Sequence, residues 1–123
     1  MAIETYRDLR VWQVAMDLAV EAYRLTSAFP REEIFGLTSQ IRRAGSSIAA
    51  NIAEGYGRDS TGSYIQFLRV AQGSLKELET HLFLAERVGF CQSGATAPLL
   101  SSCDALGRML RALIRSLERG GTE

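Results

Sequence analysis

At 123 residues, the chain is long enough for one domain with a buried core and too short for two. Its composition, 46% hydrophobic and 23% charged, is typical of a globular protein rather than a disordered or membrane-embedded one. Fourteen basic residues balance fourteen acidic ones, which excludes a chain-wide positive field that would attract nucleic acid or anionic lipid. All basic residues but Lys76 are arginine, a bias that either phosphate recognition or genome composition explains.

The first predicted helix runs from about residue 7 to residue 28 and carries more apolar surface than one core needs. The dipeptide Phe29-Pro30 ends it, because the residue before a proline is pushed away from helical angles. Two apolar stripes follow helical spacing, the first through Leu9, Trp12, Met16, Ala19, Tyr23 and Thr26 and the second through Val11, Ala15, Leu18, Ala22, Leu25 and Phe29.

The second predicted helix, residues 37–57, has an unusually small-residue surface. Alanine, glycine and serine dominate residues 44–53, so neighbouring helices can approach it closely from several sides. Gly55 and Gly57 are expected to end this helix in left-handed conformations. A helix at the surface of a monomer has no need of such thin sides, and we therefore expect this one to be surrounded.

Two further helices complete the chain. A helix begins after an N-cap at Ser60 and ends near Val88 and Gly89, and another begins with Pro98 in its first turn and ends at Gly120. Leucine-rich heptad lines run along both, and no segment shows useful strand-like alternation. The sequence predicts an all-α, antiparallel up-down-up-down four-helix bundle spanning residues 1–123 as a single domain. Its expected core includes Trp12, Ile41, Ile48, Leu75, Leu78, Leu106, Leu110 and Leu113.

Cysteine usage and hydropathy indicate a cytoplasmic protein. Cys91 and Cys103 lack metal-ligand spacing, and Cys103 lies on an apolar helical seam, where a reduced buried thiol is expected. The chain opens without a signal peptide and contains no apolar run of membrane-spanning length.

Polar residues on the second helix form the first candidate site. Asn51 lies in the apolar seam, with Arg43, Ser47 and Glu54 close to the same face. A seam asparagine more often fixes helix register through a buried hydrogen bond than binds a ligand. We therefore expect these four residues to form a structural polar network between helices or between subunits.

The sequence offers little for catalysis. His81 is the only histidine and has no clustered carboxylates beside it, so we expect no metal site. There is no nucleophile elbow, and Gly55-x-Gly57 follows a helix rather than a strand, unlike a phosphate-binding loop. We interpret the chain as a non-enzyme that needs no cofactor.

A basic row is the remaining candidate. Arg108, Arg111, Arg115 and Arg119 share one face of the last helix, and Arg69, Lys76 and Arg87 form a sparser basic line on the third. These residues are either a solvated face or a nucleic-acid contact that repetition in an oligomer would strengthen.

Several motifs together resemble a known family. They are Leu9-Arg10-Val11-Trp12, Phe29-Pro30, Gly36-Leu37, Gln40-Ile41-Arg42-Arg43-Ala44, Ser47-Ile48, Asn51-Ile52-Ala53-Glu54-Gly55 and Ala71-x-Gly73-Ser74-x-x-Glu77-Leu78-Glu79. In that order they resemble the bacterial proteins named after intervening sequences in 23S ribosomal RNA genes, which are related to the accessory protein of diversity-generating retroelements. The resemblance covers residues 6–89 and implies a helical bundle that forms a cyclic oligomer, typically a pentamer, without established enzymatic activity.

Two functions from different classes follow. The first is a cyclic homo-oligomer that binds RNA or DNA non-specifically through its arginines, alone or beside a nucleic-acid-handling enzyme. The second is a protein-interaction or structural assembly module with no nucleic-acid role. Neither involves a membrane.

Overall fold

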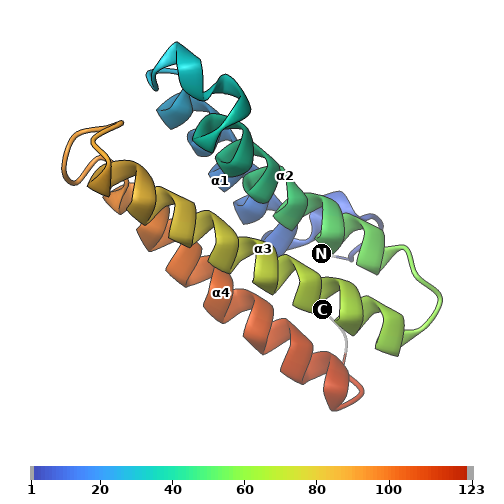
Figure 1. Cartoon of the computed structure of the whole chain (residues 1–123). Helices are drawn as coiled ribbons and strands as arrows, with labels where there is room; N and C mark the ends of the chain where they lie inside the picture. The colour runs from blue at the N-terminus through green and yellow to red at the C-terminus, as the bar shows by residue number, and fades with distance from the viewer. Residues whose placement is uncertain (1, 122–123) are drawn as a thin grey trace.

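The computed structural model describes residues 2–121, which fold into four helices without a strand (Figure 1). The helices are α1 (Arg10–Thr26), α2 (Leu37–Tyr56), α3 (Thr61–Arg87) and α4 (Ala97–Glu118), with the 3-10 turns η1 (Tyr6–Asp8) and η2 (Arg31–Phe35). The predicted all-α fold with four helices is confirmed, and the arrangement is compatible with up-down-up-down topology.

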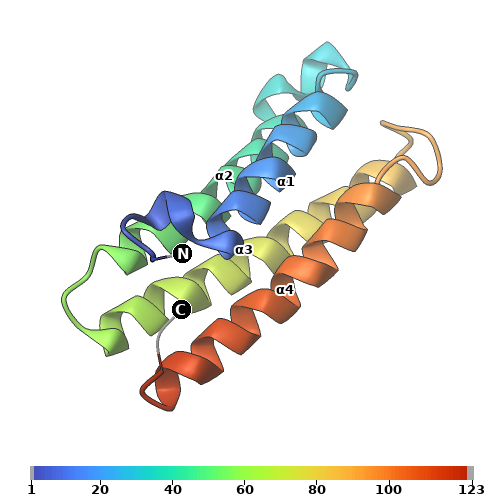
Figure 2. The same ribbon diagram turned by 180° about the vertical axis from the view of Figure 1, so that it is seen from behind.

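Helix α2 packs most extensively, against α3 on one side and α1 on the other. Helix α4 packs against α3 and α1, and in Figure 2 it lies beside α1 on the side nearer the viewer. The heptad leucines and isoleucines point into this four-helix centre, as their spacing requires. Of the eight predicted core residues, six are fully or almost fully buried: Ile41, Ile48, Leu75, Leu78, Leu106 and Leu110.

The other two predicted core residues lie at its margin. Trp12 is half-buried and packs edge-on against Tyr6, with ring centroids 5.3 Å apart. Leu113 is also half-buried, because the core line of α4 passes through its neighbour Ile114 instead. Both were predicted from the heptad pattern, which does not distinguish the core from the edge of a wide apolar arc.

Two predicted helix ends differ from those in the structure. The first predicted helix is interrupted at Leu9, which is extended and separates η1 from α1. Gly55 and Gly57 are not left-handed: Gly55 lies inside α2, and Gly57 caps it at a φ of −80°. Gly89 and Gly120 do follow α3 and α4 as the predicted helix ends, and both are left-handed, with φ of 82° and 80°.

Capping and burial fix the remaining local features. The hydroxyl of Ser60 accepts a hydrogen bond from the Ser63 backbone N–H at 3.1 Å, which confirms it as the N-cap of α3. In the last turn of α3, Glu86 accepts from the Thr96 hydroxyl and the Gly94 backbone N–H of the loop before α4, and these bonds lower the pKa of its carboxyl. Cys103 is buried as expected, and desolvation raises the pKa of its thiol to about 12.

Candidate interaction surfaces

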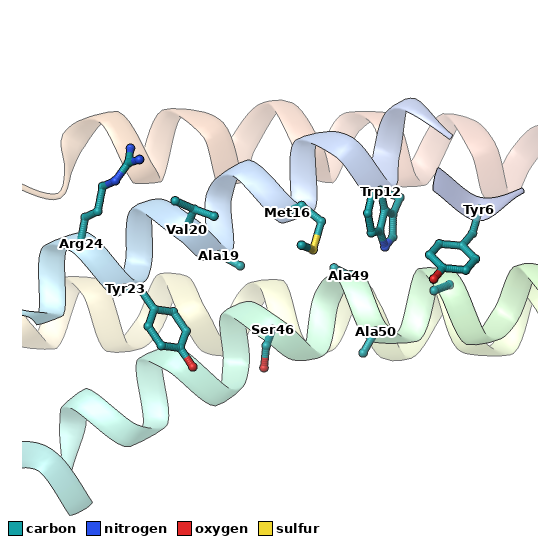
Figure 3. A pocket seen from close by; sticks show the side chains of 11 residues that line it. Tyr6, Trp12, Met16, Ala19, Val20, Tyr23, Arg24, Ser46, Ala49 and Ala50 are labelled. Carbon is teal, nitrogen blue, oxygen red and sulfur yellow. The ribbon is translucent and has the colours of Figure 1, made fainter. Parts of the chain in front are cut away.

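An apolar groove of about 570 Å³ runs along the face shared by α1 and α2 (Figure 3). Large side chains of α1 form one wall, and small residues of α2 form the other. Arg24 is its one charged lining residue. We call this surface the apolar groove; it is lined by Tyr6, Trp12, Met16, Ala19, Val20, Tyr23, Arg24, Ser46, Ala49, Ala50 and Ala53.

The groove is the surplus apolar surface that the sequence predicted. The second stripe of α1 faces the core, where Val11, Ala15 and Leu18 are buried. The first stripe instead turns toward the groove, where Met16 is 39% exposed and Tyr23 is 50% exposed. Because α2 contributes only small side chains here, nothing among residues 2–121 covers these apolar residues.

A close approach of the two helices shapes the groove floor. A Cβ added at Gly45 would lie 3.6 Å from the Cα of Ala19 and 3.7 Å from the Cβ of Ala22. The glycine and alanines therefore let α1 and α2 pack closely, which brings Ala49 beside the Trp12 and Met16 side chains, while Ala50 lines the groove from the exposed side of α2 (Figure 3).

The predicted polar network is smaller than expected. The Asn51 side-chain N–H donates to the Ser47 carbonyl at 2.8 Å and to the Ser47 hydroxyl at 3.0 Å, and that hydroxyl pairs with Ser74 of α3 at 2.9 Å. Glu54 lies outside this group, in an exposed ion pair with Arg58 at 2.9 Å. Arg43 is exposed and lines an open polar pocket beside Ser47. The network thus links α2 to α3 through the pair of Ser47 and Ser74, and Asn51 orients the Ser47 hydroxyl.

Replacing Asn51 with alanine should lower the free energy of unfolding by about 1 kcal/mol, because the Ser47 hydroxyl loses the donor that orients it toward Ser74. Urea denaturation measures this loss. Thr80→Ala is the matched control, since the Thr80 hydroxyl also donates to a backbone carbonyl four residues earlier but is exposed. Equal effects of the two substitutions would contradict a structural role for Asn51.

The basic residues predicted on α3 and α4 fall into two groups. Three have acidic partners: Arg69 pairs with Glu118 at 2.9 Å, Lys76 with Glu79 at 3.0 Å, and Arg108 with Asp104. The basic side chain of each pair is exposed, so the three ion pairs contribute little to the stability of the fold. Their acidic partners do, however, reduce the positive charge of this surface. Arg111, Arg115 and Arg119 are exposed and form no ion pair with the residues that the structure describes.

Three arginines nevertheless converge on one hollow between α3 and α4. Arg69, Arg111 and Arg115 line an open pocket of about 330 Å³ together with Gln72, Ile114 and Glu118. We call this surface the arginine pocket. Its three guanidinium groups outnumber its single carboxylate, whereas Lys76 lies apart from it.

The part of the chain that the structure describes offers neither a metal site nor a membrane-spanning helix. Residues 2–121 contain no group of three or more His, Cys, Asp or Glu side chains placed to hold a metal ion. Both ring nitrogens of His81 are buried without a hydrogen-bond partner among those residues. No described helix is long and apolar enough to cross a bilayer.

The fold and its surfaces define a small all-α bundle with an uncovered apolar face. The family model of the 23S rRNA-intervening sequence protein matches residues 7–112, and the chain belongs to this family. A crystal structure of a protein of unknown function from the S23 ribosomal protein family of Bacteroides thetaiotaomicron has the same fold, with a TM-score of 0.75. It is 24% identical, over 85% of this chain and 97% of that one. No curated protein matches the sequence.

Proposed function

We propose that this protein is a non-enzymatic, self-assembling interaction module whose copies associate through the apolar groove into a closed cyclic oligomer. The observation that carries the proposal is the groove itself. Three large apolar side chains, Met16, Val20 and Tyr23, stay exposed side by side in it, and grouped exposed apolar residues of this kind mark contact with another macromolecule. The resemblance of the motifs to the intervening-sequence family favours five copies. Two free cysteines suit the reducing cytoplasm in which we expect the protein to act.

The groove also has the chemistry of an interface core. Trp12, Tyr6 and Tyr23 are the aromatic residues that dominate binding energy when an interface desolvates them. Charge is nearly absent from the lining, as in the centres of interfaces between identical subunits. Association would bury the half-exposed Met16, Val20 and Tyr23 and so remove their contact with water.

A charge in the groove should therefore abolish assembly. We expect light scattering at micromolar concentration to give about five times the subunit mass for the wild type and a single subunit mass for Ala50→Glu. Ala50 is exposed and lines the groove, so glutamate there leaves the bundle core intact while placing a carboxylate in the interface.

Ala112→Glu provides the matched control, because Ala112 is an exposed alanine on α4 outside the groove. This variant should keep the wild-type mass, and both variants should keep the wild-type helical circular dichroism. A monomeric wild type, or an Ala50→Glu variant of unchanged mass, would overturn the proposal.

Non-specific nucleic-acid binding is the second candidate function, and the arginine pocket favours it. Arg69, Arg111 and Arg115 come from two helices, and guanidinium groups bind phosphate oxygens in pairs of hydrogen bonds. A single neutral subunit would bind weakly, but an oligomer presents one such pocket per copy and gains avidity.

Reversing Arg111 and Arg115 to glutamate should weaken binding to RNA and DNA of any sequence alike, since phosphate contacts carry no sequence information. In mobility shifts over a salt series, the slope of log affinity against log salt for duplex DNA should fall by roughly one for each lost phosphate contact. The control is a double reversal of Arg10 and Arg87, two exposed arginines outside the pocket, which changes net charge equally. If the wild-type oligomer binds neither nucleic acid at low salt, the arginines form a solvated surface.

A further inference from the structure

The large apolar residues that remain exposed fall into two groups at different places on the chain. Met16, Val20 and Tyr23 line the apolar groove. Most of the others gather toward the end of the bundle where α1 turns into α2 and α3 ends: Ile34, Phe35, Phe83, Leu84 and Val88. A single chain thus presents both a groove and a separate set of protruding apolar side chains.

Phe35 is the extreme member of the second group. It is 93% exposed, far more than any other large apolar residue of the described chain. It closes the short turn η2 at the tip of the α1–α2 hairpin, next to Ile34, which is 50% exposed (Figure 1). Its apolar ring therefore makes almost no contact with the core of residues 2–121, and burial within the subunit does not account for a phenylalanine at this position.

We infer that Ile34 and Phe35 of one copy insert into the apolar groove of the next copy, so that the oligomer is built from head-to-tail contacts. This inference rests on the proposed self-assembly and names the surface that fills the groove. We call Ile34 and Phe35 the tip. The tip and the groove are different surfaces of one chain, and repetition of such a heterologous contact generates a ring when the rotation closes. A groove-to-groove contact would instead give a dimer.

Charge and shape support this occupant. The groove is lined by apolar and hydroxyl-bearing residues apart from the cationic Arg24, and it opens along the flank of the hairpin (Figure 3). The tip follows the acidic residues Glu32 and Glu33. Glu33 already accepts the Leu37 backbone N–H at 2.9 Å, whereas Glu32 is exposed. Arg24 pairs with Glu21 of its own chain through one nitrogen at 2.7 Å, and its exposed guanidinium group keeps further N–H donors with which Glu32 of the neighbouring copy can pair.

The test uses two variants that each remove one half of the contact. Phe35→Asp has a defective tip and an intact groove, whereas Ala50→Glu has an intact tip and a defective groove. Each alone should be a folded monomer by circular dichroism and light scattering. Mixed in equal amounts, they should form a dimer of one copy of each, because only one intact tip and one intact groove can meet and neither end can extend.

Other results are equally decisive. If Ala50→Glu is monomeric but Phe35→Asp keeps the wild-type mass, assembly through the groove stands and the tip is refuted as its occupant. If both variants are monomeric and their mixture stays monomeric, the head-to-tail contact is refuted. Phe83→Asp, which changes a 56% exposed phenylalanine of α3, should keep the wild-type mass. Dissociation by Phe83→Asp without dissociation by Phe35→Asp would assign the groove to the end of α3.

Discussion

Replacing Gly55 with alanine should destabilise the fold by about 1–3 kcal/mol, the usual cost of overpacking a filled interior. A Cβ at this position would lie 2.7 Å from the Cβ of Phe67, 3.1 Å from the Tyr64 ring and 3.2 Å from the Tyr64 backbone oxygen. Two of these atoms are backbone or directly attached to it, so α3 itself must move away from α2. The ordinary helix-forming advantage of alanine over glycine, up to about 1 kcal/mol, offsets only part of this strain.

Gly45→Ala is the matched control for this substitution. Both glycines are buried inside α2, but a Cβ at Gly45 would meet its nearest neighbour at 3.6 Å, an ordinary contact. We expect this variant to be as stable as the wild type or more stable by up to about 1 kcal/mol. Urea denaturation at matched protein concentration compares the two, because assembly makes stability concentration-dependent. Equal stabilities of the two variants would show that α3 yields to the added methyl group.

The fold was predictable because local pattern and tertiary packing agree in this chain. Leucine at three- and four-residue spacing along α3 and α4 predicted the buried lines through Leu75, Leu78, Leu106 and Leu110. Ser60, Pro98 and Gly89 marked helix ends by chemistry that acts within a few residues. Predictions of this kind need no knowledge of which helix lies opposite.

Predictions failed where the outcome depends on the neighbouring element. Gly55 was expected to end α2 because glycine often does, yet it serves the close approach of α3, which only the packed structure reveals. Trp12 was placed in the core because its stripe is apolar, although it lies in the groove, at the margin of the core. When the apolar face of a helix is this wide, the sequence alone does not show which part of it packs into the core and which part faces outward.

For the polar candidate residues, too, contacts within one helix were predictable and contacts between helices were not. The link from Asn51 to Ser47 follows helical spacing and was anticipated, but its partner Ser74 comes from α3. The spacing of Arg108, Arg111, Arg115 and Arg119 placed them on one face, whereas the ion pair between Arg69 and Glu118 spans 49 positions of the sequence. The packing of α3 against α4 therefore decides which arginines have an acidic neighbour and where the surface stays positively charged.

The motif around Arg42 and Arg43 contains a further difference that the sequence alone does not show. Arg42 is half-buried, and its guanidinium group donates to the Thr26 hydroxyl at 2.9 Å and to the Tyr23 carbonyl at 3.4 Å. The same group stacks on the Tyr23 ring, 4.5 Å from its centroid. These contacts lie at the last turn of α1, where the helix dipole favours a cation. Arg42 thus fastens α2 to the end of α1 and holds the Tyr23 ring at one end of the apolar groove.

Arg42→Met should therefore lower the free energy of unfolding by about 2 kcal/mol, because hydrogen bonds from a charged donor and the ring contact are lost together. Methionine keeps most of the aliphatic stem, so the loss reports on the guanidinium group. Arg42→Lys should recover little of it, since a compact ammonium group has no planar face to stack on the Tyr23 ring while it donates to both oxygens. Arg43→Met is the control and should change stability by less than about 0.5 kcal/mol, because Arg43 is exposed. Urea denaturation measures all three variants, and similar losses at the two positions would contradict the assigned role of Arg42. Light scattering on the same samples adds a second readout, because a Tyr23 ring released from Arg42 should weaken assembly through the groove while the Arg43 variant assembles normally.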